Sequence, residues 1–378
     1  MTTFFQYDSP EYILKLHHET YPLMTPCDAV KLLYQNEFGG GHMITDPQAS
    51  LHLLEKEYHT LSLAGSRLWE EIGNGYARLN LHALDTDRLP LDMVNRIFVQ
   101  SSSELHGTQE AFFQKLEVLK ELTQKGIFSF TEDALNQYLA EYAVHGYPAV
   151  SHSETYRQAY HPAYRVIRME YIAYLPLIEA GLAVLSRHLQ TSSSARTDSD
   201  VILSVPVLMA LDGCSASGKT TAANLLGALL DATVIHMDDF FLPLPMRTST
   251  RLNEPGGNVH YERFRKEVLE PILAGQSPVY RVFDCSTGDY GKTIHSRLTP
   301  LVIIEGAYAL HPYLNTDYSI TAFFEISSGE QKRRILARNG AVMFQNFAAK
   351  WIPMENKYFT ECLIPEKCQF VIRTEDFI

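Results

Sequence analysis

The chain has 378 residues, more than one hydrophobic core usually serves, so we expect two domains. Its formal charge of −12 at pH 7 argues against a nucleic-acid-binding protein, which normally carries a basic face. Hydrophobic residues make up 46% of the chain and charged residues 20%, a balance that excludes a disordered protein.

The five cysteines are scattered and odd in number, so reduced thiols in a cytosol are the simplest interpretation. The first residues lack the basic segment and apolar run of a signal peptide, and no window approaches 18 uncharged apolar residues. We therefore expect a cytoplasmic protein whose partners include neither nucleic acid nor a membrane. A homodimer is left open.

Residues 1–189 have a mainly helical pattern, in which apolar side chains recur at helical spacing. Asp28 is the expected cap of the first clear helix. A longer helix is expected from Tyr164 to Leu189, with a kink near Pro176. The other expected helices cover the segments 26–38, 46–61, 108–126 and 131–146.

One stretch of this half, LWEEIGNGYARLNLHAL, departs from the helical pattern. Its Asn74-Gly75 centre, flanked by alternating residues, predicts a β-hairpin. Arg78, Asn80 and His82 stand at alternate positions after the turn, so we expect them on one face of a strand.

Eleven of the fifteen histidines precede residue 191. None forms an H-x-x-x-H pair, and C-x-x-C is absent, so a metal site is disfavoured and ordinary core and surface histidines are the simplest interpretation. The alternative is a polar ligand pocket built from Glu37, His42, Arg78 and His152. This half resembles no family that we can name. It could sense a ligand, complete a substrate site or act as a second enzyme.

The segment 190–200, QTSSSARTDSD, is small, polar and without apolar periodicity, which predicts a linker. After it, short β-rich runs alternate with helical segments. This alternation predicts βαβ units and a three-layer α/β domain with a parallel sheet over residues 201–378. The expected strands lie in the segments 205–211, 232–237, 300–306, 320–326 and 368–374.

The stretch ALDGCSASGKTTAANLLGALL contains G-x-x-x-x-G-K-T, with a predicted strand before it and a predicted helix after it. In this setting backbone N–H groups and the helix N-terminus would bind the phosphates of ATP. Lys219 would reach the outer phosphates and Thr220 would ligate Mg²⁺. The expected nucleotide-binding residues are Gly213, Ser215, Ala216, Ser217, Gly218, Lys219, Thr220 and Thr221.

The rest of this half separates a kinase from a GTPase. A GTPase needs N-K-x-D, but the one Asn-Lys pair, at 356–357, continues into Tyr-Phe. A small-molecule kinase needs a carboxylate near the acceptor hydroxyl, another near the metal, and arginines over the phosphate. Asp238 and Asp239 follow a predicted strand at the edge where α/β sheets bind ligands, and Glu305 ends another.

The candidate arginines lie in EQKRRILARNG, where Arg334 and Arg338 are spaced i,i+4 on one predicted helix. Both could therefore reach one phosphate. The alternative is a solvated basic helix without a catalytic role.

The second half as a whole resembles the uridine kinase and phosphoribulokinase group of P-loop kinases. The segments that carry the resemblance, in the order of the group, are GCSASGKTT, HMDDFFLP, NVHYERFRKEVLEPI, YRVFDCSTGDY, VIIEGAYAL and RRILARNG. The resemblance implies that Asp238 takes the proton from the acceptor hydroxyl and that Glu305 organises Mg²⁺. It implies that Arg334 and Arg338 close over the triphosphate, and that Lys219 assists catalysis.

The acceptor positions depart from this group. Members that phosphorylate nucleosides usually have an aspartate where this chain has His260, and a serine where it has Asp239. They use Tyr-Asp-Phe followed by a histidine where this chain has Phe283-Asp284-Cys285 and no histidine. Uridine is therefore doubtful as the acceptor. We expect Asp239, His260, Arg281 and Asp284 to contact it.

The segment FAAKWIPMENKYFTECLIP follows the arginines and is rich in aromatic residues. Core packing of Trp351, Tyr358 and Phe359 is the simpler interpretation. The alternative is that Lys350 or Glu355 reaches the substrate.

Together these features predict an ATP-dependent and Mg²⁺-dependent kinase acting on the hydroxyl group of a nucleoside-like or sugar-like metabolite. The alternative is a nucleotide-sensing regulator, whose P-loop domain switches the N-terminal domain without phosphorylating a substrate.

Overall fold

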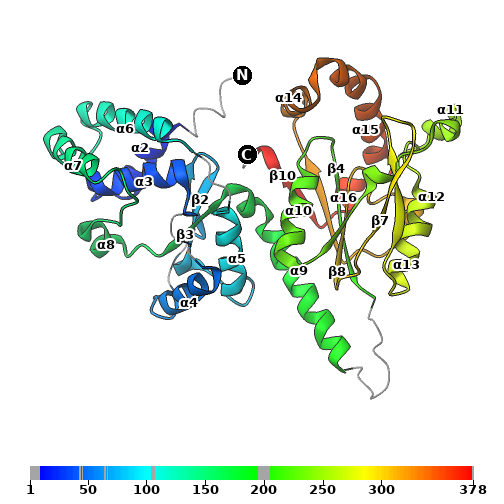
Figure 1. Cartoon of the computed structure of the whole chain (residues 1–378), viewed down its shortest axis with the longest axis horizontal. Helices are drawn as coiled ribbons and strands as arrows, with labels where there is room; N and C mark the ends of the chain where they lie inside the picture. The colour runs from blue at the N-terminus through cyan, green and yellow to red at the C-terminus, as the bar shows by residue number, and fades with distance from the viewer. Residues whose placement is uncertain are drawn as a thin grey trace. The chain divides into compact units, whose positions relative to one another are not determined.

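The computed structural model describes residues 9–41, 44, 46–63, 65, 67–103, 107–194 and 205–376 (Figure 1). The chain divides into two compact units, Met1–Ile172 and Ala173–Ile378, called here the first and second unit.

The division falls inside helix α9 (Met169–Ser194), ahead of the expected linker. The Tyr171 hydroxyl donates to Gln100 Oε1 at 3.0 Å within the first unit. Three residues later, the ring of Tyr174 packs against Phe324 of the second unit. Residues 190–194 of the expected linker continue this helix, and residues 195–200 lie outside the described part of the chain.

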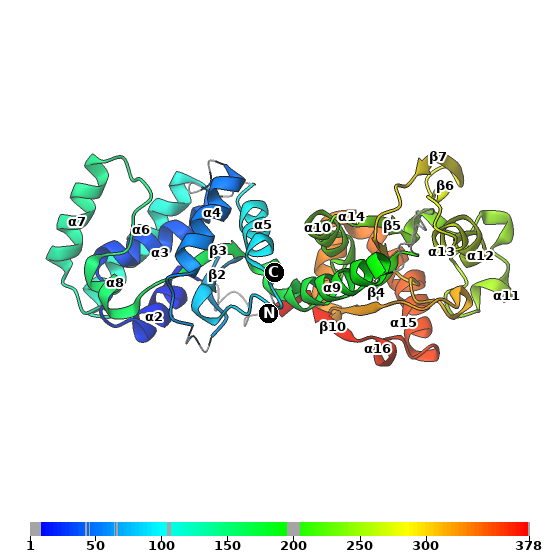
Figure 2. The ribbon, with the colours of Figure 1, turned by 90° about the horizontal axis from the view of Figure 1, so that it is seen from below.

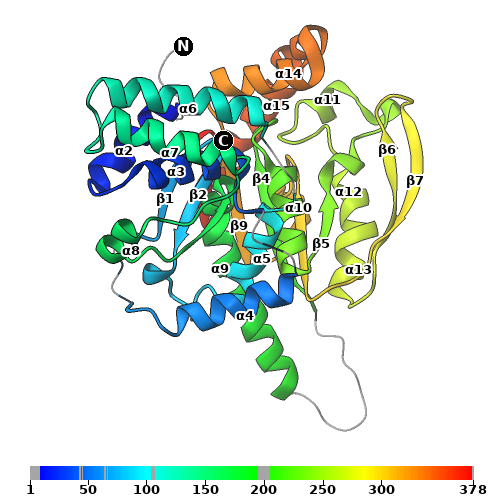
Figure 3. The same ribbon diagram turned by 60° about the vertical axis from the view of Figure 1, so that its left-hand side comes forward.

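The first unit is mainly helical, as predicted. Helices α6 and α7 pack on α2 and α3, and Figure 3 shows them stacked. Their contact faces bury apolar side chains such as Leu33, Phe112 and Leu119. The helices are α2 (Pro10–Thr20), α3 (Pro26–Phe38), α4 (Pro47–Tyr58), α5 (Leu91–Ser101), α6 (Gln109–Gln124), α7 (Glu132–Val144) and α8 (Glu154–Tyr160).

Helix α3 begins one residue after Thr25, which is its N-cap, so the prediction that Asp28 caps it was wrong. Asp28 is instead the third residue of a capping box, where its carboxylate accepts from the Thr25 backbone N–H at 2.9 Å. The proline at the first helical position favours this start.

The predicted hairpin is confirmed as β1 (Trp69–Gly73) and β2 (Tyr76–Asn80), and Asn74 and Gly75 both have positive φ. A third antiparallel strand, β3 (Tyr164–Arg168), pairs with β2. The long helix predicted from Tyr164 was therefore wrong over its first five residues. Their apolar pair, Val166 and Ile167, is β-branched and suits a sheet.

The second unit contains a five-stranded sheet in the order β10-β9-β4-β8-β5, in which every neighbouring pair is parallel. All five predicted strands are confirmed. Strand β8 is buried throughout, as in sheets covered on both faces. The strands are β4 (Val207–Gly213), β5 (Thr233–His236), β8 (Leu301–Glu305), β9 (Ile320–Glu325) and β10 (Phe370–Arg373).

Alternating side chains give this sheet two apolar faces, so the predicted three-layer fold is confirmed (Figure 2). Leu208, Val302 and Phe323 join one hydrophobic cluster with Phe264 and Phe359 of the covering helices. Helix α10 (Lys219–Leu230) contacts β4, β5 and β8. The first covering layer is formed by α12 (Tyr261–Phe264), η5 (Arg265–Leu269), α13 (Glu270–Leu273), α15 (Ile352–Glu361) and α16 (Ile364–Lys367).

A β-hairpin and a long helix of this unit carry several of the predicted site residues. Strands β6 (Val279–Asp284) and β7 (Asp289–His295) form a separate antiparallel hairpin (Figure 3), which the sequence analysis did not predict. Helix α14 (Ser328–Asn346) carries the predicted arginines and is interrupted at Gly340, whose φ is 78°. The π-helical turn η7 (Phe347–Trp351) links α14 to α15.

The segment Met169–Gln190 of α9 is long and apolar enough to span a membrane by length and composition. The sequence analysis looked for 18 uncharged apolar residues in a row and therefore did not select this segment. The segment is selected when its mean hydropathy is considered and a few charged residues are allowed. Half of this window is buried inside the protein.

Candidate functional site

The P-loop connects β4 to α10 and adopts the conformation that its glycines permit. Gly213 has a φ of 139°, and a Cβ atom there would lie 2.3 Å from the carbonyl oxygen of Phe324. Gly218 is the left-handed N-cap of α10. The backbone N–H groups of the first turn of α10 have no acceptor within the helix, which makes this end an anion-binding position.

Lys219 is buried and donates to the carbonyl oxygens of Gly213 and Cys214, both at 2.8 Å. Ser217 has a buried hydroxyl for which the described residues provide no hydrogen-bond partner. An unsatisfied buried hydroxyl beside unpaired N–H groups fits a loop that binds phosphate oxygens.

The predicted metal residues lie together at the carboxyl edge of the sheet. Thr220 Oγ1 lies 3.1 and 3.2 Å from the two carboxylate oxygens of Glu305. His236 is paired in register with Glu305 across β5 and β8, and its Nδ1 lies 2.5 Å from Glu305 Oε1. The hydrogen bond to Glu305 raises the pKa of His236. The sequence analysis quoted this histidine within a motif but gave it no role.

Asp238 and Asp239 follow β5 directly, in the short helix η3 (Met237–Phe240). Asp238 is exposed to solvent, yet protein atoms crowd its carboxyl group. Desolvation is the main cause that raises the pKa of Asp238, and the negative charge of Glu305 is the second. Desolvation also raises the pKa of Asp239. Both carboxyls therefore bind a proton more readily than an isolated aspartate does.

Helix α14 reaches the P-loop through Gln331 and Arg334. Gln331 Nε2 donates to Ser215 O at 3.0 Å, and Arg334 Nη1 donates to Ala216 O at 3.5 Å and to Thr374 Oγ1 at 2.9 Å. Arg334 Nη2 is buried without a partner among the described residues. A cationic donor therefore stands beside the loop.

Arg338, the other predicted arginine, is exposed, and its Nε donates to Asn339 Oδ1 at 2.8 Å. The structure thus brings one arginine of the pair to the P-loop and not the other. That both arginines reach one bound phosphate therefore stays a prediction. The catalytic role of Arg338 stays a prediction.

Helix α15 places a buried carboxylate on the same loop. Glu355 Oε2 accepts from the Ser215 backbone N–H at 3.0 Å, and its other oxygen accepts from the Ser215 hydroxyl. Desolvation raises the pKa of Glu355, and the nearby charge of Lys219 opposes this effect. The sequence analysis held this residue only as an alternative to core packing, while Tyr358 and Phe359 are indeed buried.

The residues predicted to contact the acceptor lie in several places. His260 is the N-cap of α12, and its Nδ1 is buried without a partner among the described residues. Arg281 is exposed with its guanidinium 4.4 Å from the centre of the Tyr290 ring. Asp284 accepts from the backbone N–H and hydroxyl of Ser286, which lowers its pKa. Asp284 is therefore engaged in its own turn.

The oxygen donors of Thr220 and Glu305 suit Mg²⁺, which prefers carboxylate and hydroxyl oxygens together with phosphate. The Thr220 hydroxyl and the Glu305 carboxylate lie within hydrogen-bond distance of each other, so both could contact one ion. These residues therefore fit a magnesium ion. No group of three or more histidine, cysteine, aspartate or glutamate side chains placed to hold a metal is found among the described residues.

The alternative of a ligand pocket built from Glu37, His42, Arg78 and His152 is not supported for Glu37 and His152, which other residues engage. Glu37 is buried and accepts from Thr108 N at 2.7 Å, with Lys115 Nζ 2.5 Å away. His152 lies between Asp28 and Tyr164. His42 lies outside the described residues. Of Glu37, Arg78 and His152, which are the described residues of this set, Arg78 alone lines the pocket of about 110 Å³ in this unit.

No protein-family model and no curated protein sequence matches this chain. Among solved structures, a possible uridine kinase from Bacillus stearothermophilus matches 50% of this chain and 98% of its own, with 18% identity and a TM-score of 0.35. A protein named as a fructose transport system kinase from Silicibacter matches the same shares, with 19% identity and a TM-score of 0.37.

A D-glycerate 3-kinase from Cryptococcus neoformans matches 49% of this chain and 86% of its own, with 14% identity and a TM-score of 0.34. The N-terminal half of the chain has no counterpart in these structures. A possible uridine kinase is thus among the solved structures to which this chain is similar.

Proposed function

We propose that the second unit transfers the terminal phosphoryl group of ATP to a hydroxyl group of a small metabolite. The observation that carries this proposal is the contact between Thr220 of the P-loop and Glu305, at the sheet edge that also presents Asp238. Phosphoryl transfer needs a bound triphosphate, charge stabilisation and a base for the acceptor hydroxyl. Each of these needs has a residue at this edge.

The triphosphate would bind the N–H groups at the start of α10, with the Ser217 hydroxyl as a further donor. Lys219 would exchange its two carbonyl acceptors for phosphate oxygens. Arg334 stands beside the loop with an unpaired buried nitrogen, so it can bind the charge that develops on the transferred group.

Asp238 would hold the acceptor hydroxyl and take its proton. Its raised pKa makes its carboxylate a stronger base than that of an isolated aspartate, which favours proton transfer from the hydroxyl. Thr220 and Glu305 would hold Mg²⁺, which when bound supplies positive charge against the phosphate oxygens. His236 keeps the Glu305 carboxylate oriented through their hydrogen bond.

Replacement of Asp238 by asparagine tests the proposal, because it keeps the side chain's size and removes the base. We expect kcat to fall about 10²- to 10⁴-fold while ATP affinity changes little. The acceptor is first found by screening nucleosides, sugars and vitamins for ADP release. An Asp238→Asn enzyme with unchanged turnover would contradict the assigned base.

The same screen separates a kinase from a nucleotide-sensing regulator. A regulator binds ATP without acceptor-dependent ADP release, and a Lys219→Met variant should then lose nucleotide binding without any change in turnover. Mass spectrometry of small molecules that copurify with the chain would narrow the acceptors to be screened.

A further inference from the structure

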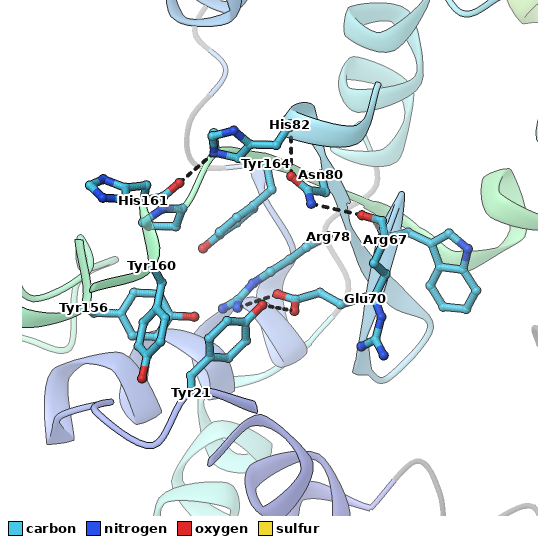
Figure 4. A pocket seen from close by; sticks show the side chains of 13 residues that line it. Tyr21, Arg67, Glu70, Arg78, Asn80, His82, Tyr156, Tyr160, His161 and Tyr164 are labelled. Atoms are coloured by element: carbon cyan, nitrogen blue, oxygen red, sulfur yellow. Dashed lines mark hydrogen bonds and ion pairs between the residues drawn. The ribbon is translucent and has the colours of Figure 1, made fainter. Parts of the chain in front are cut away.

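The first unit contains a pocket of about 110 Å³ over one face of its three-stranded sheet (Figure 4). Strand register places Glu70 directly opposite Arg78, and Asn80 opposite Tyr164. The predicted alternation of Arg78, Asn80 and His82 is confirmed in that all three line this pocket, although His82 lies in the 3₁₀-helix η2 (Leu81–Ala83). Tyrosines from α8 and from the end of α2 complete the wall.

Arg78 is the floor of the pocket and is only 2% exposed. Its Nη1 donates to Glu70 Oε1 at 3.0 Å, while Nε and Nη2 donate to Gln35 Oε1 at 3.0 and 2.8 Å. A guanidinium has five N–H donors, so each terminal nitrogen keeps one N–H for which the described residues give no acceptor. The Tyr164 ring lies against the guanidinium, 4.6 Å from its carbon atom.

The other polar groups of the wall differ in whether a partner already uses them. The Tyr21 hydroxyl donates to Glu70 Oε2 at 2.6 Å, so both carboxylate oxygens are hydrogen-bonded. Burial lowers the pKa of His152 to about 4, and its Nδ1 donates to Asp28. Its Nε2 therefore accepts the proton of the Tyr164 hydroxyl.

Two tyrosines keep their hydroxyl protons for a ligand. Tyr156 is 3% exposed, and burial and neighbouring charges, rather than any hydrogen bond found among the described residues, act on its hydroxyl. Figure 4 shows that hydroxyl pointing toward the Arg78 guanidinium. The Tyr160 hydroxyl accepts from the Leu23 backbone N–H at 2.9 Å, which leaves its own proton free to donate. Of these two hydroxyls, that of Tyr156 is the unused donor that faces Arg78.

The charged groups of the wall favour an anion. Two arginines, Arg67 and Arg78, line the pocket, and the negative charge of Glu70 neutralises the positive charge of Arg78. Arg67 has no ion-pair partner among the described residues, so the wall carries one positive charge in excess. A buried anion is stabilised where a guanidinium and hydroxyl donors converge on it, whereas a cation would find no free acceptor carboxylate here.

We propose that this pocket binds the oxyanion group of a small metabolite, a carboxylate or a phosphate, against Arg78 and the hydroxyl of Tyr156, with the positive charge of Arg67 in the same wall. The volume admits a ligand of a few heavy atoms beyond that group, with aromatic rings beside it. This site is separate from the P-loop and does not depend on the kinase proposal.

Tryptophan fluorescence tests the proposal in the full chain. The chain has two tryptophans, and Trp69 lines the pocket, so a Trp351→Phe chain reports from Trp69 alone. Inorganic phosphate and acetate are titrated separately at constant ionic strength. We expect a saturable change in emission with at least one of them, and a response to one only identifies the group that is bound.

Two substitutions in the Trp351→Phe chain assign the signal. Arg67→Gln should weaken binding about tenfold, and Tyr156→Phe, which removes one hydroxyl, about fivefold. Arg157→Gln is the matched control, because Arg157 is an exposed residue of α8 outside the wall and its loss removes the same charge. Emission that does not saturate with either anion overturns the proposal. Equal weakening by Arg67→Gln and Arg157→Gln also overturns it, because binding would then follow surface charge.

Discussion

The P-loop edge of the second unit and the surroundings of the pocket in the first unit both contain several charged side chains. They differ in the direction in which they shift the pKa values of their carboxyl groups. At the P-loop edge, desolvation raises the pKa values of Asp238, Asp239 and Glu355. In the first unit, desolvation also acts on Asp28 and Glu70. Hydrogen bonds to Asp28 and the charge of Arg78 beside Glu70 outweigh it there, so both pKa values are lowered.

This difference shows which charges belong to the fold and which are available to a ligand. A carboxylate whose pKa is lowered has found its partners within the protein, and its ionised form stabilises the folded state. A crowded carboxylate whose pKa is raised has partners that do not offset its desolvation, as with Glu355 and Ser215, and it gains from a bound cation or proton. The first unit therefore uses its buried carboxylates as structure and offers arginine and tyrosine donors. The second unit offers carboxylates.

The largest expected effect comes from breaking the buried pair of the first unit. An Arg78→Met variant leaves Glu70 without its cation, and we expect the free energy of unfolding of this unit to fall by about 3–5 kcal/mol. Denaturant unfolding followed by circular dichroism measures it. Arg157→Met is the control, since its surface pair with Glu154 should cost under about 1 kcal/mol. A small loss in Arg78→Met would show that Glu70 is not held by this pair.

The pH dependence of the first unit should follow its buried histidines. Burial lowers the pKa values of His17 and His152 to about 4, from an ordinary value of 6.5. Between those values the unfolded chain binds more protons than the folded one, so stability falls as pH decreases from 6.5 to 4. The loss is about 1.4 kcal/mol per pH unit for each histidine. Urea unfolding at several pH values measures this loss. In the His17→Gln variant, the free energy of unfolding should fall less steeply with decreasing pH than in the unchanged protein.

A smaller effect separates the two arginines of α14. Arg334→Ala should weaken ATP binding about tenfold, because Arg334 stands at the P-loop with an unpaired nitrogen. Arg338→Ala should change ATP affinity by less than about twofold, because Arg338 is exposed and bonds to Asn339. Calorimetric titration of the full chain with ATP compares them. Equal losses would mean that the nucleotide-bound enzyme brings both arginines to the phosphates.

The smallest expected effect concerns Glu355. Glu355→Gln keeps an acceptor for the Ser215 N–H and removes a negative charge from the loop that would hold a triphosphate. We expect ATP affinity to rise severalfold, about 1 kcal/mol or less. The matched control is Glu361→Gln, an exposed residue of the same helix. Weaker ATP binding in Glu355→Gln would show instead that the carboxylate supports the bound state.

The sequence by itself determined the elements whose signals are local. Asn74 and Gly75 specify their turn because they tolerate positive φ, and Gly213, Gly218, Lys219 and Thr220 specify the P-loop between a strand and a helix. The order of apolar runs predicted all five parallel strands. Parallel strands share one carboxyl edge, so the juxtaposition of Thr220 and Glu305 followed from their positions alone.

Only the tertiary structure decided which polar groups are already satisfied. Glu37 and His152 look available in the sequence, but Thr108 and Asp28 occupy them in the fold. Glu355 lies 140 residues from Ser215 along the chain and reaches its backbone N–H. Tyr164 belongs to a strand because β2 offers it a partner, against its apparent helical pattern. Burial and hydrogen bonding between distant segments leave no periodic trace in a sequence, so pairing of this kind is read only from the folded chain.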